Sequence, residues 1–228
     1  AQLAETSSDD LELCKVDVND GSVVSRATSL RLFPKFLAPD GVYGGVYPDS
    51  TFQKRDPDDL SKIWENSIGR PRVVTSDGSG SLYVGLRDTY EYNLAKIDAT
   101  TGNTEWKRNI VNSDGYGDIS ALTFSKESGH LYVANDLLDE IKKIDPSDGS
   151  TVTSTDHATV YYLRAHTDGN IYAYSDVTNE FYEEDSKIVR LDGDLNEQDT
   201  LLVEEYEPFG IDKADDTGRV YISGETVK

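Results

Sequence analysis

Apolar and polar residues alternate along most of the chain in short runs. Strict alternation puts apolar side chains on one face of an extended strand, so these runs predict half-buried β-strands. Clusters of Gly, Asn and Asp separate them, and no window shows the i, i+3, i+4, i+7 apolar spacing of an amphipathic helix. The pattern therefore predicts an all-β protein.

The same strands recur at regular intervals. An apolar-Tyr-apolar strand occurs five times, with its tyrosines 40, 49, 40 and 49 residues apart: Tyr43, Tyr83, Tyr132, Tyr172 and Tyr221. A second strand ends in Asp17, Asp98, Asp145 and Asp192, and more weakly in Asp56, and leads through a polar turn to a third strand. A period of about 40–50 residues with four strands per unit is typical of β-propeller blades.

Counting strands outward from the propeller axis as A to D gives five of each class. The expected A strands are 30–37, 70–75, 119–124, 160–166 and 207–212, and the B strands contain the five tyrosines. The expected C strands are 11–17, 51–56, 93–98, 140–145 and 187–192, and the D strands 22–28, 62–68, 104–110, 150–155 and 198–204. We predict one domain, residues 1–228, forming a five-bladed propeller with four antiparallel strands per blade.

The chain begins with a C and a D strand and finishes with an A and a B strand. Pairing these two half-blades would close the ring and remove free sheet edges that invite aggregation. We expect this closure. The alternatives are an open fragment of a longer array and a domain excised from a larger surface protein.

One unit resembles the repeat of quinoprotein-like (PQQ-like) propellers. Leu82-Tyr83-Val84-Gly85 is followed by the segment from Ala95 through Asp98, Thr101 and Gly102 to Trp106. In that family an apolar-Asp strand leads through a Thr-Gly turn to a Trp on the outer strand. The units around Asp17 and Asp145 match partly and lack the Trp. The resemblance implies the propeller fold and says little about function.

Charge excludes several functions. Forty-three acidic residues against 22 basic ones give a net charge of −21 and a pI near 4.3. Such a surface repels nucleic acid and anionic membranes. Halophiles use net charge on this scale, so we expect a salt-adapted source. No apolar run is long enough for a membrane helix. Cys14, the single cysteine, cannot form an intramolecular disulfide.

The sequence shows no catalytic motif. The Asp-rich turn from Asp192 fails the EF-hand pattern, because its sixth and twelfth positions hold Glu197 and Val203. Asp and Asn side chains that accept hydrogen bonds from nearby backbone amides, as in Asx turns, account for these Asp-rich segments. The three histidines do not have the spacing of metal ligands. We expect no catalytic residue, no metal and no cofactor. A propeller enzyme of hydrolase, lyase or quinoprotein type, with a channel-centred metal site, is the alternative, since scattered sites leave no linear motif.

The candidate binding residues lie on the longer B–C and D–A loops and in the channel. They are Tyr90, Tyr92, Tyr116, Phe181 and Tyr182 on the loops, and Arg72 on an A strand. Aromatics on loops above a rigid scaffold are typical of contact surfaces, although they can also pack over blade edges. We predict a non-enzymatic binding or assembly scaffold with a protein or glycan partner, part of a larger assembly, on a cell envelope or virion surface. The sequence does not determine the compartment.

Overall fold

A computed structural model describes most of the chain. The described residues are 13–17, 19–27, 32–46, 49–87, 91–110, 118–135, 139–157, 159–178, 184–203, 206–212 and 221–226. They form 20 β-strands, each overlapping a segment that the alternation pattern predicts, with bounds that differ by one to three residues in several cases. The fold is therefore all-β, as expected.

Four sheets have four antiparallel strands each, and we number them as blades in chain order. Blade 1 contains β3 (Leu32–Ala38), β4 (Gly41–Val46), β5 (Thr51–Arg55) and β6 (Lys62–Asn66); blade 2 contains β7 (Arg70–Ser76), β8 (Ser81–Arg87), β9 (Leu94–Asp98) and β10 (Thr104–Arg108). Blade 3 contains β11 (Ile119–Ser125), β12 (His130–Asn135), β13 (Glu140–Ile144) and β14 (Thr151–Asp156); blade 4 contains β15 (Val160–Ala165), β16 (Ile171–Thr178), β17 (Glu184–Leu191) and β18 (Glu197–Val203). Sequential strands are neighbours in every blade, as a propeller requires.

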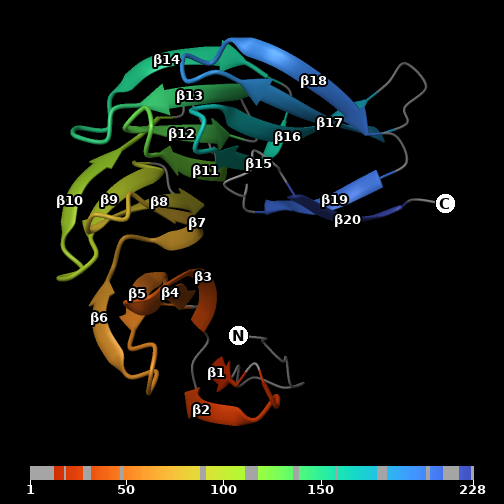
Figure 1. Cartoon of the computed structure of the whole chain (residues 1–228). Helices are drawn as coiled ribbons and strands as arrows, with labels where there is room; N and C mark the ends of the chain where they lie inside the picture. The colour runs from red at the N-terminus through yellow and green to blue at the C-terminus, as the bar shows by residue number, and fades with distance from the viewer. Residues whose placement is uncertain are drawn as a thin grey trace.

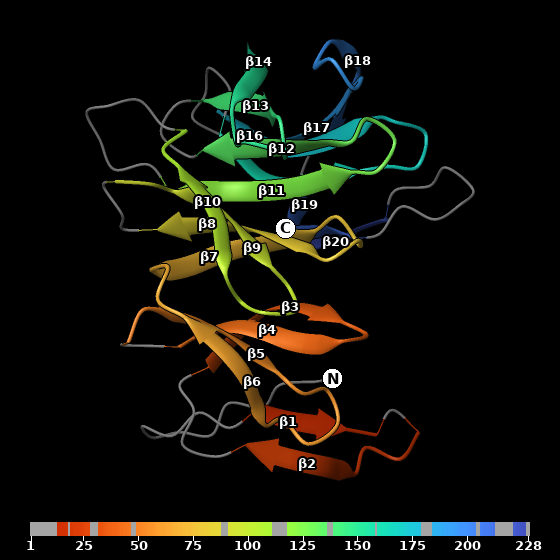
Figure 2. The same ribbon diagram turned by 90° about the vertical axis from the view of Figure 1, so that its left-hand side faces the viewer.

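The blades form an arc around a common centre, and the first strand of each blade lies innermost (Figure 1). Seen from the side, the N-terminal hairpin and blades 1, 2 and 3 follow one another in chain order (Figure 2). Apolar residues fill the space between neighbouring blades. The repeated B-strand tyrosines Tyr43, Tyr83 and Tyr132 are at most 1% exposed. The repeat therefore marks the buried layer between blades.

Two hairpins complete the described chain. β1 (Leu13–Val16) pairs with β2 (Val23–Ala27), and β19 (Tyr206–Asp212) pairs with β20 (Tyr221–Thr226). They lie at the two ends of the arc (Figure 1). Among the described residues they form separate two-stranded sheets, so the expected ladder between β20 and β1 is not formed. Closure of the ring stays a prediction.

The repeated Asp residues organise the turns between C and D strands. The Asp98 carboxylate accepts hydrogen bonds from the backbone amides of Thr100 and Thr101, at 3.0 and 2.7 Å. Asp192 does the same for the amides of Asp194 and Asn196, both at 2.9 Å. These contacts are the Asx turns that the sequence predicts.

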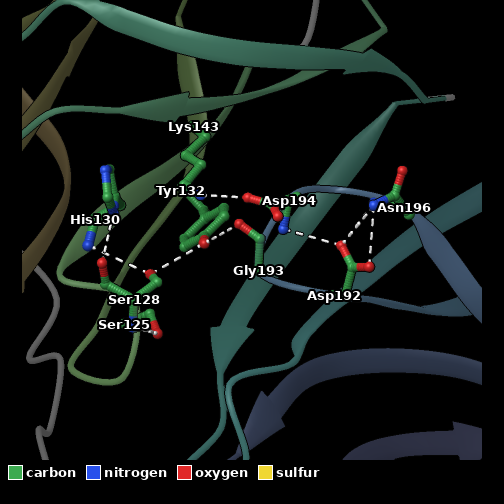
Figure 3. Close-up of polar contacts among 9 residues, drawn as sticks. All are labelled: Ser125, Ser128, His130, Tyr132, Lys143, Asp192, Gly193, Asp194 and Asn196. Carbon is green, nitrogen blue, oxygen red and sulfur yellow. Dashed lines mark hydrogen bonds and ion pairs between the residues drawn. The ribbon is translucent and has the colours of Figure 1, made fainter.

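These turns also hold neighbouring blades together. The Trp64 indole of blade 1 donates a hydrogen bond to the Ala99 carbonyl of blade 2 (3.1 Å), and Trp106 donates to Pro146 in blade 3 (3.1 Å). In blade 3, Tyr132 donates to the carbonyl of Gly193 (2.7 Å) (Figure 3). Each acceptor directly follows the repeated Asp of the next blade. The carbonyl after the repeated Asp therefore accepts a hydrogen bond from the preceding blade in three successive blade pairs, from a D-strand Trp in two and a B-strand Tyr in the third.

Acid should weaken the Asp turns. Hydrogen bonds from Thr101 to Asp98, and from Ser147 to Asp145, lower the pKa of each carboxyl below its usual value. A carboxyl whose pKa is lower in the folded state stabilises the fold above the unfolded pKa of about 3.9, and that contribution is lost as pH falls through the folded pKa. We expect carboxyl NMR titration in molar KCl to give both residues pKa values below 3.9. Values at or above it would contradict the role given to these turns.

Candidate functional site: a cationic pocket on the loop face

The propeller has two distinct faces. The C–D turns, such as 98–103 and 145–150, lie on one face, which we call the turn face. The B–C and D–A connections leave from the opposite ends of the strands, on what we call the loop face. The candidate site lies on the loop face, because Val46 and Arg87 end B strands and Arg70 begins an A strand.

A pocket of about 390 Å³ opens between blades 1 and 2. Its lining comes from strands β3, β4, β7 and β8, and consists of Phe33, Lys35, Gly45, Val46, Arg70, Pro71, Arg72 and Arg87. Four of these eight residues are cationic and none is acidic. A volume of this size accommodates a small ligand or a few side chains of a partner.

β-Bulges place two of the cations. The β7–β8 ladder shifts between Pro71 and Val73, so Arg72 is the extra residue of the inner strand. The β3–β4 ladder shifts in the same way between Pro34 and Phe36, which makes Lys35 the extra residue. A bulge bends a strand and re-aims the side chain at that point. Lys35 and Arg72 therefore occupy equivalent positions in neighbouring blades and line one pocket.

Glycine and proline determine how closely the two blades approach. A Cβ atom on Gly45 would lie 2.6 Å from Cγ of Pro71, which is far inside van der Waals contact. Gly45 in blade 1 and Pro71 in blade 2 therefore meet at the floor of the pocket.

Asp118, just before β11, is the carboxylate that contacts this cluster. Its Oδ2 atom lies 3.2 Å from the Arg72 guanidinium and 3.7 Å from Nε of Arg87. The Lys35 side chain is exposed, yet partial desolvation by the surrounding atoms lowers its pKa, and repulsion by Arg87 and Arg72 lowers it further. The positive charges are thus close enough to destabilise one another, and an anion placed among them would relieve that repulsion.

The inner strands differ sharply in composition from the rest of the chain. Strands β3, β7, β11 and β15 contain no Asp or Glu, although the whole chain has 43. They do carry Lys35, Arg70, Arg72 and Arg164. Three of the four innermost strands are therefore cationic, and the fourth, β11, is uncharged, within a strongly anionic protein.

The predicted binding residues divide into three groups. Arg72 lies in the pocket, and its partner Asp118 shows that it also neutralises a carboxylate. Tyr92 is half-buried, and its ring lies under Nζ of Lys107, 4.1 Å from the ring centroid. Tyr90, Tyr116, Phe181 and Tyr182 lie outside the described residues.

Sequence reasoning missed Lys35, Arg70 and Arg87. The absence of acids from the first four of the five expected A strands was the available signal. Their convergence with Arg72 depends on two bulges and on the approach of blade 1 to blade 2, which no local pattern encodes.

Among the described residues, no three His, Cys, Asp or Glu side chains gather closely enough to hold a metal ion. The described part of the chain also contains no helix long and apolar enough to cross a membrane.

Solved structures with this architecture define the class of protein. The chain is similar to hydrazine synthase of Kuenenia stuttgartiensis, with a TM-score of 0.67 and 12% identity over 82% of this chain and 53% of that one. It is similar to KlAtg21, solved with the coiled coil of AgAtg16, with a TM-score of 0.70 and 11% identity over 93% of this chain and 69% of that one. The β-propeller domain of Cps50 (Swd1) from Myceliophteria thermophila gives 0.57 and 9% over 88% and 83%.

The protein is a β-propeller, as the strand order and these similarities show. The chain spans about half the length of the hydrazine synthase chain that it matches. No family model and no curated protein matches the sequence, so the PQQ-like character stays a resemblance of the residues.

Proposed function

We propose that the protein is a non-enzymatic binding or assembly module from a salt-adapted source, with the loop face as its contact surface. The observation that carries this proposal is the cationic pocket, which lies on that face in a chain of net charge −21. Four cations around one cavity, two of them sharing a single carboxylate, favour an anionic group placed among them. A protein or glycan partner on a cell envelope or virion surface fits such a module.

The proposal includes a closed five-bladed ring. Lys15 of the N-terminal hairpin forms an ion pair of 2.9 Å with Asp58 in blade 1. Lys143 of blade 3 forms the same kind of pair, at 2.8 Å, with Asp194 of blade 4 (Figure 3). Each lysine lies two residues before its strand's Asp, and each partner lies two residues after the Asp of the next blade. The hairpin β1–β2 thus contacts blade 1 as a C–D hairpin should.

Blade 4 shows no corresponding ion pair among the described residues. Arg190 is its matching cation: its terminal nitrogen lies 3.9 Å from Asp199 of the same blade, and its buried Nε has no hydrogen-bond partner among the described residues. In a closed ring, the C–D turn that begins at Asp17 would lie beside Arg190, with Asn19 at the position of Asp58 and Asp194. Joining β19–β20 to β1–β2 would therefore complete a fifth blade and bring a neutral hydrogen-bond acceptor, the Asn19 amide oxygen, to Arg190 in place of a carboxylate.

Stability should depend strongly on salt. Repulsion within a chain of charge −21 is long-ranged at low ionic strength, whereas the Debye length falls to about 3 Å at 1 M salt. We expect thermal unfolding in molar KCl to occur roughly 10 °C higher than in dilute buffer, equivalent to about 3 kcal/mol. Sucrose at equal osmolality is the control, because it is excluded from protein surfaces without screening charge. Full stability in dilute buffer would contradict salt adaptation.

The contact face can be tested by photo-crosslinking. Benzoylphenylalanine replaces Phe33, at the pocket, in one variant, and replaces Asp59, an exposed residue of the turn face, in a matched variant. Both proteins are irradiated in a molar-KCl extract of the source organism. We expect a discrete adduct from the Phe33 variant alone. An adduct from the Asp59 variant alone would assign the contact to the turn face and contradict the proposal that the loop face is the contact surface.

A further inference from the structure

The cationic pocket also indicates what kind of group the partner presents. We infer that it binds an acidic peptide segment of a protein partner, carrying at least two carboxylates beside an apolar side chain. This inference rests on the proposed function and deepens it, because it concerns the same face. The argument uses the geometry of the cations, the effect of salt and the apolar part of the lining.

The geometry already shows how a carboxylate is held. Arg72 comes from β7 and Arg87 from β8, yet both reach the same Oδ2 atom of Asp118, at 3.2 and 3.7 Å. Their side chains remain 33% and 47% exposed, so solvent and a partner can reach both of them. A guanidinium matches a carboxylate in shape and charge. An incoming carboxylate can therefore approach the two arginines alongside Asp118.

In molar salt, a charged partner can be held only by charges that it contacts directly. With a Debye length of about 3 Å in molar salt, only charges in direct contact still interact strongly. Three of the four cations are arginines, whose planar forks match carboxylates bidentately and are weakly hydrated. An acidic segment placed against several guanidiniums therefore keeps its affinity where a diffuse attraction would be lost.

The lining is not purely ionic. Phe33 is 44% exposed at the pocket, beside Val46 and Pro71. Burial of apolar surface is favourable and is strengthened rather than screened by salts that are excluded from protein surfaces. A segment that alternates acidic and aliphatic residues would satisfy both parts of the lining. A bare inorganic anion would leave the apolar part uncovered.

Charge also explains why the partner would dock here. In a chain of net charge −21, an acidic partner is repelled over most of the surface. The turn face displays the exposed carboxylates of Asp20, Asp58, Asp59 and Asp148. The pocket is a concave surface at which an acidic segment meets cations, so it favours one face and one orientation of docking.

The test measures binding of a fluorescein-labelled peptide that alternates Glu and Val, by fluorescence polarisation with the full chain in molar KCl. The matched control peptide has Gln in place of Glu. We expect the Glu peptide to bind and the Gln peptide not to bind. The double variant Arg72→Gln/Arg87→Gln should weaken binding about 30-fold. The double variant Lys62→Gln/Lys126→Gln, which removes the same charge at exposed positions outside the pocket, should change it less than about twofold.

A further variant distinguishes loss of the binding site from misfolding as the cause of weaker binding in the arginine variants. Asp118→Asn removes the internal carboxylate that shares the two guanidiniums, so it should strengthen peptide binding about fivefold. General damage to the fold would not increase affinity. An unchanged or weakened affinity in this variant would count against the inference.

Other outcomes separate this inference from the proposed function. Equal loss of binding in both double variants would show non-specific attraction and overturn it. Displacement of the peptide by citrate or inorganic phosphate at lower concentrations than the unlabelled peptide itself would assign the pocket to a small anion instead. If the Glu peptide fails to bind while the Phe33 photo-crosslink still forms, the acidic segment is wrong and the contact face stands.

Discussion

Replacing Ile222 by cysteine should produce a disulfide with Cys14 and stabilise the protein by about 5 kcal/mol on a chain-entropy basis, because the bond would close most of the chain into one loop. The register of the complete blades supplies the reason. The B-strand tyrosine lies opposite the C-strand cation in all four: Tyr43 with Lys54, Tyr83 with Lys96, Tyr132 with Lys143 and Tyr172 with Arg190. The same register in a fifth blade pairs Tyr221 with Lys15 and Ile222 with Cys14.

The control is Ser223→Cys, which the same register places opposite Leu13 on the other side of the sheet from Cys14. Mass spectrometry after mild oxidation distinguishes the outcomes. An intramolecular crosslink in the Ile222→Cys variant, and little in the control, is the expected result. A crosslink between two molecules would show that the hairpins complete each other in a swapped dimer. Free thiols in both variants would contradict closure by β1 and β20.

Gly102→Ala should destabilise the fold by about 3 kcal/mol. Gly102 lies in the C–D turn of blade 2 with φ of 75°, a left-handed conformation that costs alanine about 1 kcal/mol or more. The added Cβ would also lie 2.6 Å from the Trp64 ring of blade 1, forcing the indole away from its hydrogen bond to Ala99. Chemical denaturation in molar KCl measures the loss.

Gly129→Ala separates the two contributions. Gly129 has a similar φ of 68°, but nothing lies within 4 Å of its added Cβ. We expect this variant to lose only the backbone part, about 1 kcal/mol. In a Trp64→Leu background, Gly102→Ala should cost no more than Gly129→Ala does, because the clash is absent. Equal costs in the wild-type background would show that the indole does not hold the two blades together.

Most of the fold could be predicted because its units are local and repeated. Alternation identified the strands around Tyr43, Tyr83 and Tyr132, and the Asp turns located the hairpins, so all 20 strands overlap expected segments. Both signals act over a few residues: side chains alternate along any strand, and an Asp accepts hydrogen bonds from amides two or three positions later.

The candidate site was predicted only in part. Arg72 was identified as a cation of the channel, but Lys35, Arg70 and Arg87 were not joined to it. The bulges that bring Lys35 and Arg72 into one pocket change the register by one residue, and strict alternation cannot indicate which residue is the extra one. Tyr92 was expected on a B–C loop, either in a contact surface or packed over a blade edge, and in the structure its ring lies beneath Lys107.

The sequence by itself determined the all-β class, the strands, the order of the blades and the anionic surface, since each depends on composition or on spacing along the chain. The tertiary structure alone decided which blades touch through Trp64 and Tyr132, where the inner strands bulge, and that four cations surround one pocket. These features depend on distances between residues far apart in the chain, and such distances exist only once the blades have packed against one another.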